Sequence, residues 1–365
     1  MTATVPTRRS WRSAVTTARD GAVRLAELVA TPLVPADYLD LLDPLRSGAA
    51  LRARIVDRRV ETADAATLTL EVGRGWAGHL PGQYVRLGVD VDGVRQWRAY
   101  SVTSPPTPGT RRISVTVKAI PDGVVSHHLV HRAEVGTVVQ LDQACGEFTL
   151  PPTPPAKLLF VTAGSGITPV MGMLRSHRMD DVVLVHSAPT ADDVVFGAEL
   201  RALAATGGVR LLERHTDAEG VLDVTTLGEL VPDLADRQIW ACGPTGLLDA
   251  LDEHLAAVGL AGSLHTERFR PSALVTGEGG TVTFSRSGTV VDAEGTTPLL
   301  DAGEAAGVLM PSGCRMGICF GCVVPLREGA VRDLRTGDLT TAAEGDGVLV
   351  QTCVSAAAGA CDLDL

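Results

Sequence analysis

Four cysteines near the end of the chain constrain its fold more than any other feature. Cys314, Cys319 and Cys322 form a C-x4-C-x2-C pattern, and Cys353 follows after about thirty residues. Glycines between the first three cysteines give the backbone the freedom to wrap closely around a bound group. Thiolates are soft, anionic ligands, and this spacing is the plant-type arrangement of 2Fe-2S ligands. The pattern therefore predicts a loop that binds an iron–sulfur cluster.

Other uses of these cysteines are conceivable. Cys319 and Cys322 alone could form a dithiol redox pair, and four cysteines could hold structural zinc. A zinc ribbon usually has two C-x2-C pairs, however, and this chain has one. Disulfides fit least well, because seven cysteines is an odd number and nothing marks the chain as secreted. We therefore place the cluster first, zinc second and disulfides last.

Length and charge narrow the class of protein. A chain of 365 residues can form two or three domains, each with its own core. The net charge is -11, and residues 271–365 hold twelve Asp and Glu against five Arg, a net charge of -7. Because nucleic-acid binders are basic, that class is disfavoured. The sequence shows no apolar run of membrane-spanning length and no secretory apolar core, so we expect a cytoplasmic protein.

The first half of the chain predicts an extension and a barrel. Residues 1–48 carry apolar residues at helical spacing with arginines among them, as in an amphipathic helix. Such a helix usually packs on its own protein, and the alternative is peripheral contact with the inner face of a membrane. Residues 49–152 contain short β-rich runs separated by Gly, Pro and Asp, which predicts a small antiparallel barrel. The expected strands cover residues 53–60, 66–72, 83–89, 97–102, 113–119 and 138–142.

The second half predicts two further domains. Residues 153–270 alternate strand and helix, which predicts a parallel sheet with helices on both faces. The expected strands are residues 157–162, 181–186, 208–213 and 238–241, and the expected helices are residues 167–175, 192–205 and 245–258. Residues 271–280 read as a linker. Residues 281–365 should begin with strands at 281–284 and 289–293 and a helix near 299–306, followed by the cysteine loop.

Two motifs in the barrel suit a flavin nucleotide. Arg98, Tyr100 and Ser101 end a predicted strand, where they could hold a phosphate, stack on a flat ring and bond a ring nitrogen. Residues 123–126 begin a predicted helix whose amides could meet a second phosphate. Taken alone, such strings also occur in ordinary strands.

A second pair of motifs suits a dinucleotide. Gly164 and Gly166 follow a strand and open a helix, as a pyrophosphate site requires, but Pro169 replaces the third glycine of the dinucleotide fingerprint. Without the other motifs, a glycine turn without a ligand would explain this stretch. Cys242 ends another strand at the ligand-binding edge, although a lone cysteine is more often a small buried apolar residue.

Together these motifs and the four cysteines resemble the ferredoxin-NADP reductase superfamily with a plant-type ferredoxin domain fused behind it, over roughly residues 50–365. The chain is most similar to bacterial reductases of fatty-acyl desaturases and diiron oxygenases, including the phenylacetyl-CoA oxygenase reductase type. The resemblance implies a multidomain α/β plus β fold. Its parts would be an antiparallel flavin-binding β-barrel, a parallel-sheet pyridine-nucleotide domain and a C-terminal β-grasp ferredoxin domain.

The resemblance also assigns roles to residues. The flavin would be bound by Arg98, Tyr100, Ser101, Lys118, Gly123, Val124, Val125 and Ser126. The pyridine nucleotide would be bound by Thr162, Gly164, Gly166, Thr168, Arg214, Cys242, Gly243 and Pro244, with Glu267 and Phe269 beside the flavin. Tyr100, Ser101, Cys242 and Glu267 would be catalytic, and Cys314, Cys319, Cys322 and Cys353 would bind the cluster.

The choice of cofactors rests on the same comparison. A related group uses FMN, but the stretch from Lys118 to Ser126 is more similar to that of FAD-binding members. Arg214 could pair with the 2′-phosphate of NADPH, whereas Pro189 replaces an arginine often found in NADPH users. We expect FAD and NADPH, with FMN and NADH as the alternatives.

The implied activity is conversion of electron pairs into single electrons. NADPH would give hydride to FAD, and the cluster would pass single electrons to a separate desaturase or oxygenase. The acidic end of the chain should steer it onto a basic partner surface. The alternatives are a flavin diaphorase or quinone reductase, and a redox-responsive binding protein.

Overall fold

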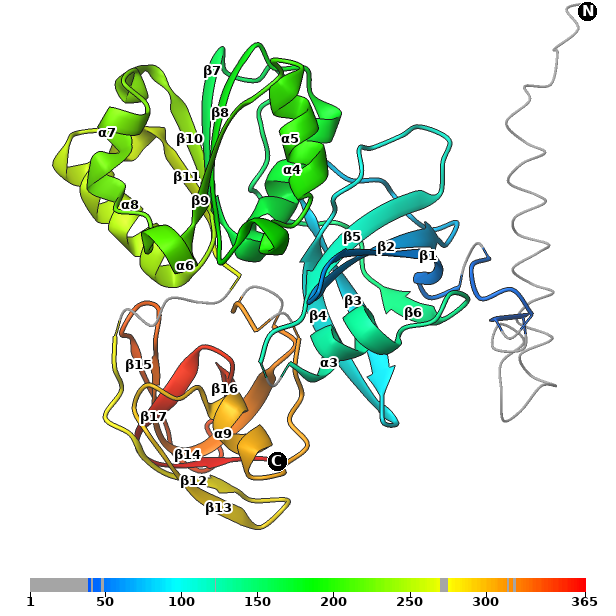
Figure 1. Ribbon diagram of the computed structural model, residues 1–365. Helices are drawn as coiled ribbons and strands as arrows, with labels where there is room; N and C mark the ends of the chain where they lie inside the picture. The colour runs from blue at the N-terminus through cyan, green and yellow to red at the C-terminus, as the bar shows by residue number, and fades with distance from the viewer. Residues whose placement is uncertain are drawn as a thin grey trace, which may run out of the picture.

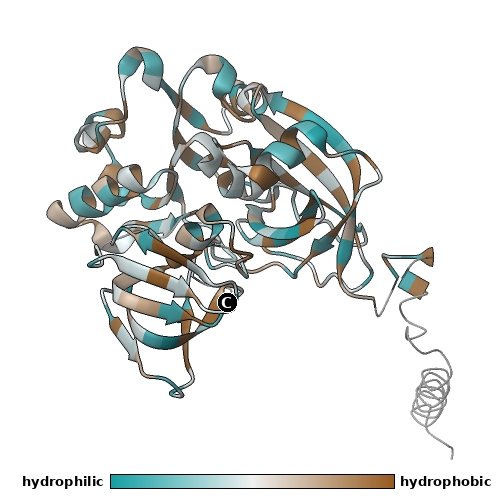
Figure 2. Cartoon of the chain, turned by 90° about the horizontal axis from the view of Figure 1, so that it is seen from below, coloured by the Kyte–Doolittle hydropathy of each residue, from teal (hydrophilic) through white to brown (hydrophobic). Residues whose placement is uncertain are grey.

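The computed structural model describes residues 39–40, 42–46, 49–121, 123–269, 275–313, 315–317 and 320–365. The predicted N-terminal helix and residues 271–274 of the predicted linker therefore lie outside the described residues, as do Cys314 and Cys319. Three compact units follow one another along the chain (Figure 1). Figure 2 shows apolar and polar residues alternating along many of the strands, as expected when one strand face is buried. None of the helices within the described residues has the length and apolar character that a membrane crossing needs.

The first unit is the predicted antiparallel barrel. Its strands are β1 (Arg52–Thr62), β2 (Ala65–Val72), β3 (Tyr84–Val91), β4 (Val94–Ser101), β5 (Arg112–Lys118) and β6 (Val138–Leu141). They pair in the order β4-β3-β6-β1-β2-β5. An isolated bridge between Val102 and Val115 joins the chain beyond β4 to β5, the other edge, so the sheet curls on itself. A short helix, α3 (Val124–His127), follows β5.

The second unit is the predicted parallel sheet. Its strands are β7 (Lys157–Ala163), β8 (Asp181–Ala188), β9 (Arg210–His215), β10 (Gln238–Cys242) and β11 (Leu264–Glu267), in the order β11-β10-β7-β8-β9. Helices α4 (Ile167–Ser176) and α5 (Gly197–Ala205) pack in one apolar core, while α7 (Leu227–Leu230) and α8 (Thr245–Ala257) pack in another. The helices thus cover both faces (Figure 1). A four-residue helix, α6 (Thr216–Glu219), follows β9.

One predicted helix begins in the wrong place. We expected a helix over residues 192–205, but α5 begins at Gly197. Phe196 has a φ of 62°, in the left-handed region, and its side chain is 3% exposed. Burial of this ring in the core therefore overrides the local helical preference and breaks the chain direction before α5. The strand β11 was not predicted at all.

The third unit is a mixed sheet with one helix. Its strands are β12 (Gly280–Phe284), β13 (Thr289–Ala293), β14 (Val323–Asp333), β15 (Leu339–Ala342), β16 (Val348–Gln351) and β17 (Ser355–Leu363), and its helix is α9 (Leu299–Ala305). The order is β13-β12-β17-β14-β15, with β16 also on β14. Strands β12 and β17 are parallel, and the other pairs are antiparallel. The cysteine loop connects α9 to β14.

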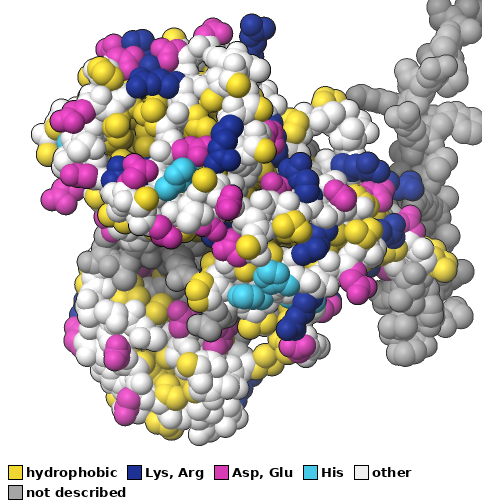
Figure 3. Space-filling view, in the orientation of Figure 1, with side chains coloured by type: hydrophobic (Ala, Val, Ile, Leu, Met, Phe, Trp, Pro, Cys, Tyr) yellow, Lys and Arg dark blue, Asp and Glu magenta, His cyan; other side chains and the backbone are white. Residues whose placement is uncertain are grey.

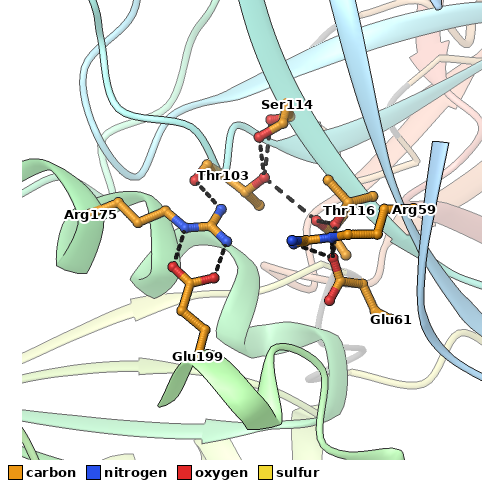
Figure 4. Close-up of polar contacts among 8 residues, drawn as sticks. Arg59, Glu61, Thr103, Ser114, Thr116, Arg175 and Glu199 are labelled. Atoms are coloured by element: carbon orange, nitrogen blue, oxygen red, sulfur yellow. Dashed lines mark hydrogen bonds and ion pairs between the residues drawn. The ribbon is translucent and has the colours of Figure 1, made fainter. Parts of the chain in front are cut away.

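A guanidinium ties the barrel to the parallel sheet. Arg175 of α4 donates from Nη1 to the carbonyl oxygen of Thr103 at 2.7 Å (Figure 4). Its Nε and Nη2 donate to the two carboxylate oxygens of Glu199 on α5, at 2.8 and 2.6 Å. Gly172 on the same helix lies so close to the barrel that a Cβ there would meet the carbonyl oxygen of Val102 at 2.5 Å. The first two units therefore meet in a tight seam, two residues beyond Ser101.

Candidate functional site

A large cavity is bordered by described residues of all three units. Its volume is about 1680 Å³, which exceeds the roughly 300–1,000 Å³ usual for small-ligand pockets. The sequence-predicted residues that line it are Arg98, Tyr100, Ser101, Lys118, Gly123, Val124, Val125, Ser126, Thr168, Glu267, Phe269 and Cys353. The structure thus brings residues that are distant in sequence to one space, with room for a flavin nucleotide beside a second ligand.

The end of β4 supplies the barrel side of this cavity. Arg98 donates from Nη1 to the carbonyl oxygen of Trp97 at 2.8 Å, and from Nη2 to Gln96 Oε1 at 3.2 Å. Burial lowers the pKa of Arg98, and the nearby charge of Arg315 lowers it further. Burial raises the pKa of Tyr100, so its phenol stays neutral. A cation and a neutral aromatic ring are therefore placed side by side, as a phosphate attached to a flat ring requires.

The hydroxyl of Ser101 is available for a hydrogen bond to a ligand. The side chain is 3% exposed, and its Oγ has no hydrogen-bond partner among the described residues. A buried hydroxyl without a partner costs about 1–3 kcal/mol, so a ligand atom that bonds to it would recover this energy. This vacancy in the hydrogen-bond network, at the cavity wall, fits a flavin ring nitrogen. The residues present therefore fit the flavin group.

Two predicted flavin-binding side chains already have partners within the barrel. Lys118 Nζ lies 2.5 and 2.6 Å from the carboxylate oxygens of Asp64. Ser126 Oγ donates to the carbonyl oxygen of Gly123 at 3.0 Å and accepts from the amide of Ile120 at 3.3 Å. Ser126 thus fixes the turn before α3, whereas Lys118 ties the end of β5 to the turn between β1 and β2; both residues also border the cavity.

The nucleotide-binding turn is closely packed. Gly164 has a φ of 54°, which favours glycine, and a Cβ on Gly166 would lie 2.0 Å from the carbonyl oxygen of Cys242. The turn after β7 therefore touches the end of β10, which brings Gly243 and Pro244 beside it. Thr168 donates from Oγ1 to the carbonyl oxygen of Ser165 at 2.9 Å. This close backbone approach is what a pyrophosphate at a strand-to-helix turn needs.

Thr162 has a partner that sequence reasoning missed. Its Oγ1 lies 2.8 Å from Nδ1 of His186, which is fully buried at the end of β8. Burial lowers the pKa of His186 to about 4, so the ring is neutral near pH 7. A lone histidine inside an apolar strand gives no signal of this contact in the sequence. The hydroxyl of Thr162 is thus held toward the core, not toward the turn.

Cys242 and Glu267 are neighbours across the parallel pair β10 and β11. Burial, then the neighbouring Glu267, raises the pKa of the Cys242 thiol, so this cysteine is not a thiolate nucleophile. Burial also raises the pKa of Glu267 to about 8. Glu267 Oε2 is buried and has no hydrogen-bond partner among the described residues. Near pH 7 the carboxyl is therefore protonated and can donate a hydrogen bond into the cavity.

Arg214 lies at the end of β9 and points into its own loop. Its Nε donates to the carbonyl oxygen of Gly220 at 2.8 Å, and its Nη2 donates to that of Glu219 at 2.6 Å. The third nitrogen, Nη1, is 3.9 Å from Glu219 Oε2. Arg214 does not line the large cavity, and neither do Thr162, Gly164, Gly166, Cys242, Gly243, Pro244 and Cys322.

The cysteine loop faces the same cavity. Cys322 and Cys353 are 1% and 4% exposed, and Cys353 borders the cavity. A side-chain hydrogen bond from Cys353 lowers the pKa of Cys322, so the two sulfurs lie side by side. Thr352 donates from Oγ1 to the carbonyl oxygen of Cys322 at 2.9 Å, which fixes this pair. Two adjacent buried thiols fit the donor set of an iron–sulfur cluster.

Arg315 is a second residue that sequence reasoning missed. It follows Cys314 in the chain, lines the cavity, and has a φ of 58°. Its Nη1 lies 3.1 Å from Asp301 Oδ1, and its Nη2 bonds Glu304 on the same helix, α9. The only trace of this contact in the sequence is an arginine within the loop and two acids three residues apart on the preceding helix. Arg315 thus brings a charge of the third unit close to Arg98 of the barrel.

Comparison with known proteins agrees with this arrangement. Sequence models of three domain families match the chain: an oxidoreductase FAD-binding domain at residues 52–150, an oxidoreductase NAD-binding domain at residues 160–253 and a 2Fe-2S iron-sulfur cluster binding domain at residues 282–358. A protein named NADPH oxidoreductase from Mycobacterium tuberculosis is 52% identical over 94% of this chain and 91% of its own length.

Two further comparisons extend this result. The ferredoxin reductase component of 3-ketosteroid-9-alpha-monooxygenase from M. tuberculosis is 32% identical over 76% of this chain and 82% of its own. The structure of phthalate dioxygenase reductase matches the fold with a TM-score of 0.58 and 24% identity, over 86% of this chain and 97% of that one. The chain therefore belongs to the ferredoxin-NADP reductase superfamily, as an NAD(P)H oxidoreductase with FAD, NAD(P) and 2Fe-2S domains of the type that serves oxygenases as a reductase component.

Proposed function

We propose that this chain carries electrons from NADPH, through FAD and a 2Fe-2S cluster, to a separate acyl desaturase or diiron oxygenase. The observation that carries the proposal is the shared cavity, which is bordered by the end of β4, by Glu267 and Phe269 of the nucleotide domain, and by Cys353 of the cluster loop. When bound, the flavin accepts two electrons as a hydride and releases them one at a time. The domain limits that accompany the proposal are residues 49–152, 153–270 and 281–365.

The barrel residues hold and orient the flavin in this proposal. Arg98 pairs with its phosphate, Tyr100 stacks on its ring, and the free hydroxyl of Ser101 bonds the ring nitrogen N5. The remaining phosphate is received by the amides of Val124 and Val125, together with Lys118 and the turn that contains Gly123 and Ser126. Because Ser101 Oγ has no hydrogen-bond partner among the described residues, it need not break an existing bond to bind the flavin.

The nucleotide-domain residues bring the nicotinamide to the flavin. The turn from Gly164 to Thr168 receives the pyrophosphate, and the contact between Thr162 and His186 fixes the end of β7 that precedes this turn. Cys242, Gly243 and Pro244 form the edge beside the nicotinamide. Glu267 holds a proton there near pH 7, and Phe269 excludes water from the same wall.

The choice of NADPH and of a desaturase is the finer part of the proposal. Arg214 at the end of β9 is the cation available for a 2′-phosphate, although it must then exchange a carbonyl contact or loosen its pairing with Glu219. The relative with 52% identity is named an NADPH oxidoreductase, which supports the same choice. On the face drawn in Figure 3, acidic side chains stand out on the cluster domain, which suits a partner with a basic docking surface.

The cluster would be held by Cys314, Cys319, Cys322 and Cys353. The first two lie outside the described residues, so their role rests on the sequence spacing. The adjacent buried sulfurs of Cys322 and Cys353 support the other half of the ligand set.

Peripheral membrane contact by the basic segment within residues 1–38 also rests on sequence. Sedimentation with anionic vesicles, with and without that segment, tests this contact.

An anaerobic titration followed by visible absorption tests the proposal. Addition of NADPH should bleach the flavin and then the cluster bands, and NADH should do so at a lower kcat/KM. Purified diiron acyl desaturase should then reoxidise the cluster, and added salt should slow this step because charge steering is screened. If neither NADPH nor NADH bleaches the protein, the proposed redox chain is contradicted. If the protein is bleached but the desaturase does not reoxidise it, only the proposed partner is contradicted.

A further inference from the structure

Besides Arg315, a second arginine of the third unit forms a hydrogen bond with the cysteine loop. Arg335, two residues beyond the end of β14, donates from Nη1 to the carbonyl oxygen of Gly317 at 3.1 Å. Gln351 donates from Nε2 to the same oxygen at 3.0 Å, and Arg335 Nη2 also donates to Gln351 Oε1 at 3.3 Å. Gly317 lies between the predicted ligands Cys314 and Cys319. Two side chains from outside the loop therefore fix one carbonyl within the ligand-bearing segment.

The arginine itself is held in place. Its Nε and Nη2 donate to the two carboxylate oxygens of Asp333, at 3.1 and 2.6 Å, and Asp333 also accepts from the backbone amide of Arg335 at 2.8 Å. A two-point contact between guanidinium and carboxylate restricts rotation of the planar group. Asp333 therefore orients the guanidinium so that Nη1 faces the loop.

The glycine in the loop is matched to this arginine. Gly317 has a φ of 75°, and a Cβ there would lie 2.3 Å from Arg335 Nη1 and 2.8 Å from a methyl carbon of Val354. A side chain at 317 would thus push the guanidinium away from the loop. The close approach of Arg335 is built into the loop geometry and is not a loose surface contact.

The guanidinium also acts on the thiolates. Arg335 is hydrogen-bonded to Gly317, two residues before Cys319, and to Gln351, two residues before Cys353. The charge of the guanidinium therefore lies close to both ligand-bearing segments, and electrostatic interaction between charges is mutual. Reduction adds one negative charge to an iron–sulfur cluster, and its potential depends on net charge, hydrogen bonds and exposure. A fixed cation beside the sulfurs stabilises the reduced form.

We propose that Arg335 is a positioning residue that holds the cluster loop through Gly317 and raises the reduction potential of the cluster, so that electrons pass more readily from flavin to cluster. The inference rests on the proposed 2Fe-2S function and deepens it by naming the group that sets the potential. Arg335 carries out both roles with one guanidinium: hydrogen bonding fixes the loop, and charge favours reduction.

The chain offers a matched control. Arg332, at the end of β14, also donates from Nη1 to a glycine carbonyl, that of Gly337, at 2.7 Å. Its Nε and Nη2 donate to the carboxylate of Glu278, at 3.3 and 2.5 Å. Its pKa is raised by this hydrogen bond and by the charge of Glu278, with no contribution from a cysteine. Arg332→Gln therefore removes the same kind of contact from the same domain without touching the cluster loop.

The experiment compares the full-length proteins after anaerobic cluster reconstitution. A redox titration followed by electron paramagnetic resonance gives the cluster potential, and iron release to a chelator gives its retention. Arg335→Gln should have a more negative potential than the wild type and Arg332→Gln. Arg335→Lys keeps the charge but not the planar fork, so its potential should stay near that of the wild type. Both Arg335 variants should release iron roughly tenfold faster, as loss of an outer-shell contact typically does.

The outcomes separate the two parts of the inference. Equal potentials for Arg335→Gln and Arg332→Gln would overturn the charge role, and equal iron release for Arg335→Lys and the wild type would overturn the loop-holding role. If Arg335→Gln assembles no cluster while its flavin content is normal, the loop-holding role is supported. The charge role is then tested with Gln351→Leu, which keeps the cation. A cluster potential of this variant that differs from the wild-type potential would overturn the charge role. Absence of a cluster from the wild type would instead overturn the proposed function.

Discussion

The carboxyl of Glu267 leads to a prediction about pH. Burial raises its pKa from the usual 4.5 to about 8 in the folded protein. Between these values the unfolded chain gives up the proton while the folded chain keeps it, so stability must fall as pH rises. One pKa unit corresponds to about 1.4 kcal/mol, so the full loss above pH 8 amounts to at most roughly 5 kcal/mol. Below pH 4.5 this penalty is absent.

The substitution Glu267→Gln removes the titration while keeping the size of the side chain. We expect the variant and the wild type to have similar stability at pH 5, and the variant to become the more stable protein as pH approaches 8.5. Urea unfolding followed by tryptophan fluorescence measures this difference, because Trp240 is buried in the neighbouring strand β10. Exposed Glu229 on the same domain provides the control, since Glu229→Gln should run parallel to the wild type.

The same protonation bears on electron transfer. A neutral carboxyl donates a hydrogen bond to the nicotinamide side of the cavity, whereas the carboxylate does not. Flavin reduction by NADPH, measured by stopped flow, should therefore slow in the wild type above about pH 8, and this slowing should be absent from Glu267→Gln. A stability difference that stays constant from pH 5 to pH 8.5 would refute the reasoning, because it would show that Glu267 titrates at the same pH in both states.

Three further predictions concern packing, ligation and the domain seam. Gly166→Ala should abolish tight nucleotide binding in fluorescence titrations, because the new Cβ would meet the carbonyl oxygen of Cys242 at 2.0 Å; unchanged affinity would disprove that the turn is this close. Cys353→Ser should lose the iron and electron transfer to a protein acceptor but retain NADPH-dependent ferricyanide reduction; retention of iron would argue against ligation. Arg175→Ala should cost about 2–3 kcal/mol, from its charged hydrogen bonds, and slow flavin reduction, whereas Arg201→Ala, which breaks an exposed pair within one domain, should do neither.

The sequence predicted the architecture because its local signals and the tertiary structure agree. The short runs of the barrel and the buried strands of the parallel sheet appear near their expected positions, since each run is bounded by turn residues that end a strand. The exceptions have tertiary causes. Phe196 leaves the helical region to bury its ring, and β11 is a four-residue strand at a sheet edge. Neither cause can be seen in a local window of sequence.

The sequence indicated the motifs of the candidate site, but it did not indicate the hydrogen-bond partners of their side chains. The cavity brings together Arg98 and Ser101, as their spacing on a strand end predicts. Lys118, by contrast, pairs with a carboxylate that lies 54 residues earlier in the chain. Arg214 bonds carbonyl groups of its own loop, and Arg335 reaches back 18 residues to Gly317. Such choices depend on which groups the finished fold places within about 3 Å, so residue type alone cannot reveal them.

The shared cavity would give the flavin that we propose it binds a mechanical role beside its redox role. Its walls belong to three units, whose buried apolar residues form four core clusters. A ligand that contacts all of them only when they are assembled favours the assembled arrangement by its binding free energy. A flavin bound there would therefore stabilise the assembly of the three units, so that a change in the domain arrangement would alter both the flavin affinity and the electron-transfer route.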